Sequence, residues 1–377
     1  MTPRFFSLLL AVSLASPLPA QKDETPGNRA AMLKNAPSIS TDGKVTFTLT
    51  APKASAVTLS GDWGGGRTPM IKDEKGNWTA TLPLSPQIYA YTFLVDGVRT
   101  LDPANTQLKL GRVVTASSVE VPGTPPMPWE MRDVPHGQIT TITYRSTAAG
   151  DQRRVTVYTP PGYQPDQSDK LPVLYLLHGA GELESSWVQY GRANLIADSL
   201  LADGRMKPMI IVMPKGHAYK LGETPAPGAQ PGVAFKASVF KEDLLETIIP
   251  LVEKSYRVKT DQPNRAIMGL SMGGAQSFSI GLGNLDRFSQ VGLFSAGSSS
   301  GPEVLAKLTA DPKSANDKIK LLWIGCGQLD RGFEGVQKLT ESLTKAGIRH
   351  TFKPTGGAHD WINWREYLAE TLPLLFR

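Results

Sequence analysis

The hydrophobic pattern of this chain changes once, across a proline-rich segment, and this change restricts the possible folds. Before the segment, polar and apolar residues alternate in short runs bounded by glycine-containing turns, which is typical of strands with one buried face. The clearest runs are residues 44–50, 56–60, 78–82 and 89–95. After the segment, short apolar runs alternate with helical stretches, which predicts a mainly parallel sheet covered on both faces. At 377 residues the chain is also too long for one typical domain.

These patterns predict two folded units joined by a linker. Residues 38–121 are expected to form a small all-β, immunoglobulin-like sandwich, because short strands at this spacing are typical of sandwiches. Residues 122–130 contain four prolines, which hold the backbone extended and favour a stiff interdomain linker. Residues 131–377 are expected to form one α/β domain. Its predicted strands are residues 153–158, 171–177, 209–213, 265–270, 291–295, 319–324 and 350–353.

The first twenty residues have the three parts of a secretory signal: a charged start, an apolar stretch from Phe5 to Leu14, and small residues before a polar Gln21. About 20 apolar residues are needed to span a bilayer, so we expect no membrane association once residues 1–20 are removed. Residues 21–37 are polar and are expected to be a disordered linker. The sequence therefore predicts export to the periplasm or the extracellular space.

The charge and cysteine content exclude several classes of function. Lysine and arginine number 40 against 34 acidic residues, and the resulting net charge of +6 is not gathered in a basic run, so a nucleic acid partner is not expected. The single cysteine, Cys326, cannot form an internal disulfide or a paired-cysteine metal site. The histidine spacing also gives no support to a metal site, so we expect neither a metal nor another cofactor.

The motif that most directly indicates chemistry is Gly269-Leu-Ser-Met-Gly273, which follows the apolar run 265–270. In a nucleophile elbow, a serine sits on a strained turn between a strand and a helix, and small neighbours let the turn close. Ser271 is therefore the predicted nucleophile of an α/β-hydrolase domain. A second match to the pattern is centred on Ser299, but Ser300 followed by Glu303 better resembles a helix N-cap.

A serine nucleophile needs a base, and the base needs an acid to hold its tautomer. In an α/β-hydrolase the chain order is serine, acid, histidine, and only His350 and His359 follow Ser271. His350 begins a predicted strand, whereas His359 lies in a glycine-rich loop before the final helix. His359 is therefore the predicted base.

The acid is expected between the serine and the histidine, where the candidates include Asp286, Asp311, Asp317, Asp330 and Glu334. Asp330 is preferred because it follows the apolar run 319–327 and so hangs from a strand end at the same edge as Ser271. Asp360 is adjacent to His359, and a neighbour on a tight loop rarely turns its carboxylate onto the next ring.

The oxyanion of the reaction needs preorganised donors, usually two backbone N–H groups. We expect one from Met272, directly after the nucleophile, and one from Ala180, in the loop after the strand that ends at His178-Gly. His178 is expected to shape that turn. The long segment 215–238 is rich in Gly, Pro and Ala and is either a wall of the binding site or mobile.

Five sequence segments, in order along residues 128–377, resemble carbohydrate esterase family 1, the group of feruloyl and acetylxylan esterases, and also the esterase D and enterochelin esterase families. The resemblance implies a triad of Ser271, Asp330 and His359, which agrees with the assignment from context. One departure is Ala358, which interrupts a Gly-Gly-His sequence. The segments are 176–182, 240–250, 269–274, 325–330 and 357–365.

The first unit is similar to the family 48 carbohydrate-binding modules and early-set sandwiches found before such esterases. The similarity lies in residues 61–63, 75–78, 89–97 and 102–105. Aromatic side chains of this kind can stack on sugar rings, but aromatics that alternate along strands are usually core or interface residues, and we favour that interpretation. They are Trp63, Trp78, Tyr89 and Tyr91.

The sequence thus predicts an exported serine esterase that removes feruloyl or acetyl groups from plant cell-wall xylan. Two alternatives stay open: an esterase for a trilactone siderophore of the enterochelin type, and a glycan-binding protein with an idle hydrolase domain. Three tryptophans, Trp187, Trp361 and Trp364, lie near the expected site, but the sequence assigns no substrate-binding residue and no oligomeric state.

Overall fold

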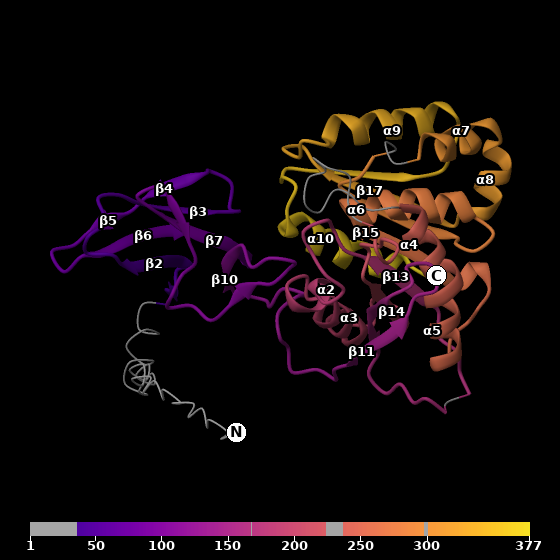
Figure 1. Ribbon diagram of the computed structural model, residues 1–377, viewed down its shortest axis with the longest axis horizontal. Helices are drawn as coiled ribbons and strands as arrows, with labels where there is room; N and C mark the ends of the chain where they lie inside the picture. Colours follow the sequence, from indigo (N-terminus) through magenta and orange to yellow (C-terminus); the bar gives the residue numbers. More distant parts are fainter. Residues whose placement is uncertain (1–35, 167, 224–236, 298–300) are drawn as a thin grey trace, which may run out of the picture.

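The computed structural model describes residues 36–166, 168–223, 237–297 and 301–377. Figure 1 shows an all-β unit, in indigo and purple, beside a larger unit in which helices surround a central sheet. The predicted signal, residues 1–20, and most of the predicted linker 21–37 lie outside the described residues. Among the helices of the described ranges, none combines the length and apolarity needed to cross a membrane.

The all-β unit, called the β-domain below, consists of two antiparallel sheets. The first has the order β1 (Ser38–Ile39), β2 (Lys44–Thr50), β6 (Asn77–Pro83), β5 (Ile71–Lys72). The second has the order β4 (Arg67–Pro69), β3 (Val57–Gly61), β7 (Gln87–Val95), β10 (Ala116–Val121), β9 (Leu108–Lys109), and β8 (Val98–Thr100) pairs with β7. The immunoglobulin-like topology stays a prediction.

Alternate residues of the two sheets meet in one hydrophobic core. Phe47 of β2 packs edge-on against Tyr91 of β7, with ring centroids 4.8 Å apart. Trp78, Tyr89 and Tyr91 are each at most 7% exposed, and Trp63 packs beside them. The aromatic residues are therefore core residues, as the alternation indicated, and none of these three buried rings forms a surface platform for sugar.

The larger unit has one sheet of eight strands, mostly parallel as predicted. Its order is β11 (Gln138–Arg145), β12 (Gln152–Thr159), β14 (Ile210–Pro214), β13 (Val173–Leu177), β15 (Arg265–Leu270), β16 (Gln290–Phe294), β17 (Leu321–Gly327), β18 (Thr351–Thr355). The strands from β14 to β18 are parallel, whereas β11 and β12 run antiparallel. Strand β11 was not predicted from the sequence, because this exposed, threonine-rich strand contains no apolar run.

Helices cover both faces of this sheet. One face packs on α2 (Ser186–Gln189), α3 (Ala193–Ala202) and α10 (Trp361–Thr371). The other packs on α4 (Ala237–Asp243), η1 (Leu244–Ile248), α5 (Ile249–Ser255), η3 (Ser277–Gly281), α7 (Pro302–Ala310), α8 (Pro312–Lys318) and α9 (Phe333–Lys345). Short 3₁₀ turns η2 (Gln262–Asn264), η4 (Leu282–Asn284) and η6 (Leu372–Leu374) complete the unit. We call it the hydrolase domain.

The two domains share a hydrophobic interface, formed on one side by β7 and β10. These strands are buried on both faces: Tyr91 points into the β-domain core, while Ile88 and Ala116 pack in the same cluster as Trp361 of the hydrolase domain. A strand buried on both faces has a packing partner on each side. The β-domain is therefore docked on the hydrolase domain beside α10.

A buried arginine fastens this interface. Arg365 of α10 is fully buried, and its guanidinium donates to the Gln87 side chain at 2.8 Å and to the carbonyls of Ile88 at 2.5 Å and Tyr190 at 3.1 Å. The predicted linker is also held in place, because the Glu130 carboxylate accepts hydrogen bonds from the backbone N–H groups of 123 and 127.

Candidate active site

The turn between β15 and α6 (Met272–Gln276) has the geometry of a nucleophile elbow. Ser271 has φ 52° and ψ −114°, a strained conformation for a residue with a side chain. Small neighbours make the turn possible, since a Cβ on Gly273 would lie 2.6 Å from the Leu177 carbonyl oxygen, and one on Gly269 would lie 2.6 Å from Gly273. The sequence pattern thus reflects close backbone packing.

The second match to the pattern falls at the start of α7. Ser299 and Ser300 lie outside the described residues, and the helix begins at Pro302 with Gly301 in the N-cap position. The predicted N-cap at Ser300 is therefore wrong by one position. Pro302 occupies the first helical turn, where its missing N–H has no effect on helix hydrogen bonding.

The structure brings the predicted serine, histidine and aspartate together at the carboxyl edge of the sheet. His359 Nε2 lies 2.9 Å from Ser271 Oγ, and His359 Nδ1 lies 2.7 Å from Asp330 Oδ2. Ser271 follows β15, Asp330 follows β17 and His359 follows β18. Parallel strands end at the same edge, and this is why residues far apart in sequence converge here.

The environment of Asp330 suits a carboxylate that orients a histidine. Its side chain is completely buried, and its Oδ1 accepts a hydrogen bond from the Gly332 N–H at 2.8 Å. Burial alone acts to raise the pKa of Asp330, but the hydrogen bonds from His359 and Gly332 outweigh it and hold the pKa below its usual value. The carboxylate therefore stays charged beside the imidazole.

Of the other acidic candidates, Asp286 does not line the cavity beside Ser271, and the remaining ones have structural partners elsewhere. Asp311 caps α8 through the Ser314 N–H, Asp317 pairs with Lys313, and Glu334 pairs with Lys338 on the outside of α9. Asp360 caps α10 by accepting from the Asn363 N–H at 3.1 Å.

Two predicted oxyanion donors flank Ser271. Met272 begins α6, and the first N–H groups of a helix have no acceptor within the helix. Ala180 lies in the loop after β13, which crosses beside the elbow. Its carbonyl oxygen is 2.9 Å from His217 Nε2, and the next carbonyl, of Gly181, accepts from the Arg112 N–H of the β-domain at 2.9 Å. The loop is therefore fixed from both domains.

His178 shapes this loop, as expected from the sequence. Its Nδ1 donates to the Gly179 carbonyl at 2.8 Å, and its Nε2 accepts from the Gly216 N–H at 2.9 Å. Burial lowers its pKa to about 3, so the ring is neutral at ordinary pH. This hydrogen bonding defines one tautomer and leaves neither nitrogen free for proton transfer.

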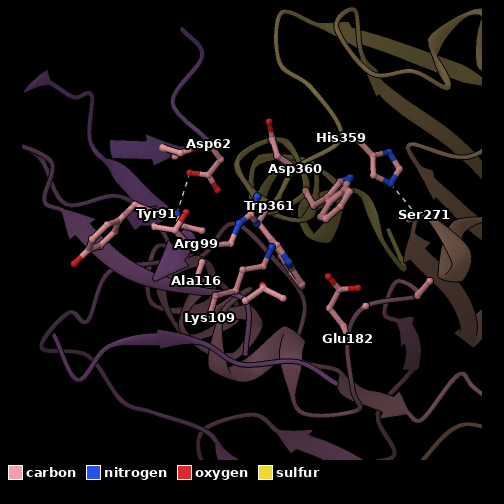
Figure 2. A pocket seen from close by; sticks show the side chains of 18 of the residues that line it. Asp62, Tyr91, Arg99, Lys109, Ala116, Glu182, Ser271, His359, Asp360 and Trp361 are labelled. Atoms are coloured by element: carbon pink, nitrogen blue, oxygen red, sulfur yellow. Dashed lines mark hydrogen bonds between the residues drawn. The ribbon is translucent and has the colours of Figure 1, made fainter. Parts of the chain in front are cut away.

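A cavity of about 470 Å³ opens from Ser271 and His359 and ends at the β-domain. Figure 2 shows Asp62, Arg99 and Lys109 of the β-domain on the side opposite the serine, with Glu182 near the loop that bears Ala180. This volume is typical of small-molecule sites. This second wall was not predicted from the sequence, because no motif in the β-domain indicates contact with the hydrolase domain.

Three comparisons with known proteins bear on this site. The Esterase family model matches residues 146–375. The chain belongs to the Esterase family, whose members are carboxylic ester hydrolases. This esterase is 34% identical over 351 residues to an endo-1,4-beta-xylanase/feruloyl esterase of Xylanibacter ruminicola, covering 90% of this chain and 46% of that protein. It is 26% identical over 161 residues to endo-1,4-beta-xylanase Y of Acetivibrio thermocellus, covering 40% of this chain and 13% of that protein.

The esterase thus spans less than half the length of these curated relatives. Among solved structures, a CE1 ferulic acid esterase from Anaeromyces mucronatus is 27% identical with a TM-score of 0.55, over 66% of this chain and 93% of that one. An enterobactin esterase from Shigella flexneri has a TM-score of 0.67 at 19% identity, over 94% of this chain and 99% of that one. This second likeness concerns the fold, and it extends over both domains.

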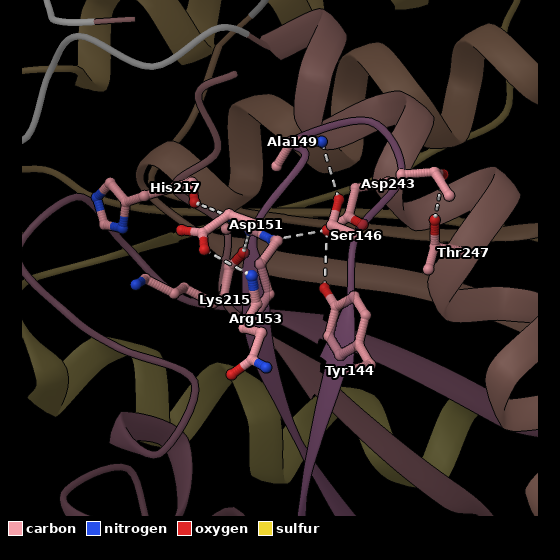
Figure 3. Close-up of polar contacts among 12 residues, drawn as sticks. Tyr144, Ser146, Ala149, Asp151, Arg153, Lys215, His217, Asp243 and Thr247 are labelled. Carbon is pink, nitrogen blue, oxygen red and sulfur yellow. Dashed lines mark hydrogen bonds and ion pairs between the residues drawn. The ribbon is translucent and has the colours of Figure 1, made fainter. Parts of the chain in front are cut away.

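In this esterase, a buried polar network supports the loop that bears Ala180 (Figure 3). Asp243 of α4 accepts from Tyr144 at 2.7 Å and from Arg153 at 2.8 Å, and Arg153 in turn donates to the His217 carbonyl at 2.8 Å. His217 then contacts the Ala180 carbonyl. These hydrogen bonds therefore connect β11, β12 and α4 to the loop beside Ser271 and hold that loop in place.

Tryptophans form the apolar floor of the site. The Trp364 ring stands edge-on to the His359 ring, with centroids 5.0 Å apart at 90°, and its Nε1 donates to the Ser295 hydroxyl. Trp361 and Trp364 line the cavity, whereas Trp187 is completely buried beneath Trp361. Of these three tryptophans, Trp361 and Trp364 are therefore the candidates for contact with a substrate.

Proposed function

We propose that this chain is a serine esterase that releases feruloyl or related hydroxycinnamoyl groups from plant cell-wall xylan. The observation that supports the mechanism is the unbroken hydrogen-bond chain from Ser271 Oγ through His359 to Asp330. Support for the acyl group comes from the relative named as a xylanase/feruloyl esterase and from the CE1 ferulic acid esterase structure. Acetyl groups on xylan are the second choice.

In the proposed mechanism, Ser271 Oγ attacks the ester carbonyl while His359 Nε2 takes its proton. Asp330 holds the imidazole with Nδ1–H toward its carboxylate and stabilises the imidazolium that forms. The N–H groups of Met272 and Ala180 stabilise the oxyanion. His359 then protonates the leaving alcohol, and water, activated by the same ring, releases the acyl group from the serine.

The proposed setting is outside the cytoplasm, periplasmic or extracellular, because the first twenty residues have the composition of a secretory signal. A polymer such as xylan is accessible to an enzyme only after export.

A trilactone siderophore is the alternative substrate. The observation that favours it is the likeness to the Shigella flexneri enterobactin esterase, which covers both domains and not the hydrolase domain alone. A likeness in fold leaves the substrate open. The proposal of a hydroxycinnamoyl ester therefore rests on the closer sequence relatives.

Two measurements test the proposal. A fluorophosphonate probe should label the wild-type protein and the Ser299→Ala variant, but not Ser271→Ala. Purified enzyme should hydrolyse methyl ferulate faster than acetylated xylan, nitrophenyl acetate or ferric enterobactin. Labelling that survives Ser271→Ala contradicts the mechanism, and preferred turnover of ferric enterobactin supports the alternative. A protein that is not labelled and turns over none of these esters would contradict the proposal and leave the glycan-binding alternative open.

A further inference from the structure

The cavity beside Ser271 has two walls of different origin. One wall belongs to the hydrolase domain and bears Ser271, His359 and Trp361. The other belongs to the β-domain, where Asp62 follows β3, Arg99 lies in β8 and Lys109 in β9. A molecule that fills the cavity therefore contacts both domains (Figure 2).

The direction of the cavity indicates which half of an ester it accepts. In serine esterases the histidine must protonate the leaving oxygen, so the alcohol half lies on the side of the histidine. Asp360 and Trp361 directly follow His359, and both line the cavity between the histidine and the β-domain. The cavity thus runs from the reacting atoms along the histidine side, where the alcohol half of the substrate is expected.

The chemistry of the far wall fits a polyhydroxylated group. The Lys109 ammonium stands over the Tyr190 ring, 5.5 Å from its centroid. Burial raises the pKa of the Asp62 and Glu182 carboxyl groups. The positive charge of Lys109 lies close enough to both carboxylates to oppose this rise. Hydroxyl groups of a sugar both donate and accept hydrogen bonds, so carboxylates and cations in alternation suit them. An aromatic acyl group requires apolar surface instead.

The far wall is held in position before any ligand arrives. The Asp62 carboxylate accepts from the Ala90 N–H at 2.9 Å, while its own N–H donates to the Ala90 carbonyl at 3.2 Å. Lys109 ends β9, which pairs with β10. Arg365 and the Arg112–Gly181 hydrogen bond fasten the β-domain to the hydrolase domain. A preformed wall of this kind adds binding without a cost of ordering.

We infer that Lys109 and Asp62 of the β-domain bind the sugar that bears the ester, and so set the specificity for the alcohol half of the substrate. This inference rests on the proposed function, because it assumes a sugar ester as substrate. The β-domain is then part of the active site. It would act on the single sugar next to the scissile bond, whereas a detached carbohydrate-binding module would act on the polymer at a distance.

The experiment compares two ferulate esters that differ only in the alcohol. Methyl ferulate has no sugar, whereas feruloyl arabinose has one. Lys109→Met keeps the apolar stem over Tyr190 and removes the charge, and Asp62→Asn removes one carboxylate at nearly constant shape. The matched control is Lys75→Met, an exposed lysine in the turn between β5 and β6 of the same domain.

With feruloyl arabinose, kcat/KM of Lys109→Met and Asp62→Asn should fall by about 10-fold or more, as expected for lost hydrogen bonds to charged groups. With methyl ferulate, the same variants should stay within about 3-fold of wild type, and Lys75→Met should match wild type on both esters. Equal losses on both esters, or no loss on either, would overturn the inference. Failure of wild type to cleave either ester would instead refute the proposed function.

A thermal melt of each variant separates binding from folding. Asp62→Asn also loses the acceptor for the Ala90 N–H if its side chain turns, so a lowered melting temperature with losses on both esters would assign Asp62 a structural role. In that case Lys109→Met, whose side chain makes no such backbone contact among the described residues, decides the inference alone.

Discussion

The two walls of the cavity differ in how their residues are held. On the hydrolase wall, Ser271, Asp330 and His359 follow three strands of one sheet and are fixed by short hydrogen bonds. On the β-domain wall, Lys109 and Asp62 belong to short strands and turns of another domain, and their position relative to the serine depends on domain docking. Reactivity is thus determined within one domain, while the shape and charge of the cavity are determined between two.

The largest expected effect is on the hydrolase wall. Asp330→Asn should lower kcat on methyl ferulate by about 10⁴-fold, because an amide favours the wrong imidazole tautomer while preserving shape. KM and the melting temperature should change little. The measurement is steady-state kinetics on purified protein.

Glu334→Gln is the matched control for this change. Glu334 is another acid between Ser271 and His359 in the sequence, but it lies exposed on α9 and pairs with Lys338. Its variant should retain wild-type kinetics. Comparable kcat values for Asp330→Asn and Glu334→Gln would show that Asp330 has no role in the reaction. The hydrolase wall would then lack the fixed acid that distinguishes it from the β-domain wall.

A smaller effect is expected from loosening the domain interface. Arg365→Met leaves the buried Ile88 and Tyr190 carbonyls without their donor, which should reduce the free energy of unfolding by about 2–4 kcal/mol. At temperatures where the variant is folded, kcat/KM should fall more for feruloyl arabinose than for methyl ferulate.

Urea denaturation and kinetics with both esters measure these effects, with Arg145→Met, exposed on β11, as the control. An equal loss on the two esters would show that docking also positions the reacting groups. Domain docking would affect the reacting groups through the Arg112–Gly181 hydrogen bond, because this bond joins the β-domain to the loop that bears Ala180.

The contrast between residues held within one domain and residues placed by domain docking also explains what could be predicted from the sequence. Ser271 and the glycines around it lie in one contiguous motif, and the order of strands in a parallel sheet leads to Asp330 and His359. The structure places these three residues in hydrogen-bond contact. Short apolar runs between helical stretches predicted the larger sheet, and the alternation of apolar residues predicted the buried aromatics of the β-domain.

Other features depend on contacts that no local pattern encodes. Lys109 appears in the sequence as one surface lysine among many, and only docking of the β-domain places it in the cavity with Glu182. Arg365 fell within a recognised segment, but its partners Gln87 and Ile88 lie in the other domain. β11 was missed because an exposed edge strand needs no apolar run.

The smallest expected effect is a difference in pH response between His217, which contacts the Ala180 carbonyl beside the hydrolase wall, and Asp62 of the β-domain wall. Burial lowers the pKa of His217 to about 4, below the 6.5 of an unfolded histidine. Below pH 6.5 the unfolded state therefore binds a proton that the folded state does not, and stability falls with falling pH until about pH 4.

Burial raises the pKa of Asp62 to about 6, above the 3.8 of an unfolded aspartate. Between these values the folded state takes up the proton, so the Asp62 contribution to stability rises as the pH falls.

Substitutions of His217 and Asp62 should therefore change the pH dependence of stability in opposite directions. His217→Gln keeps a donor for the Ala180 carbonyl and removes the titration, so the loss of stability between pH 6.5 and 4.5 should become shallower by at most about 1.4 kcal/mol per pH unit. Asp62→Asn should make the loss steeper by a similar or smaller amount. Urea midpoints at several pH values, compared with His350→Gln, measure both slopes. Slopes that move in the same direction would contradict the opposite pKa shifts of His217 and Asp62.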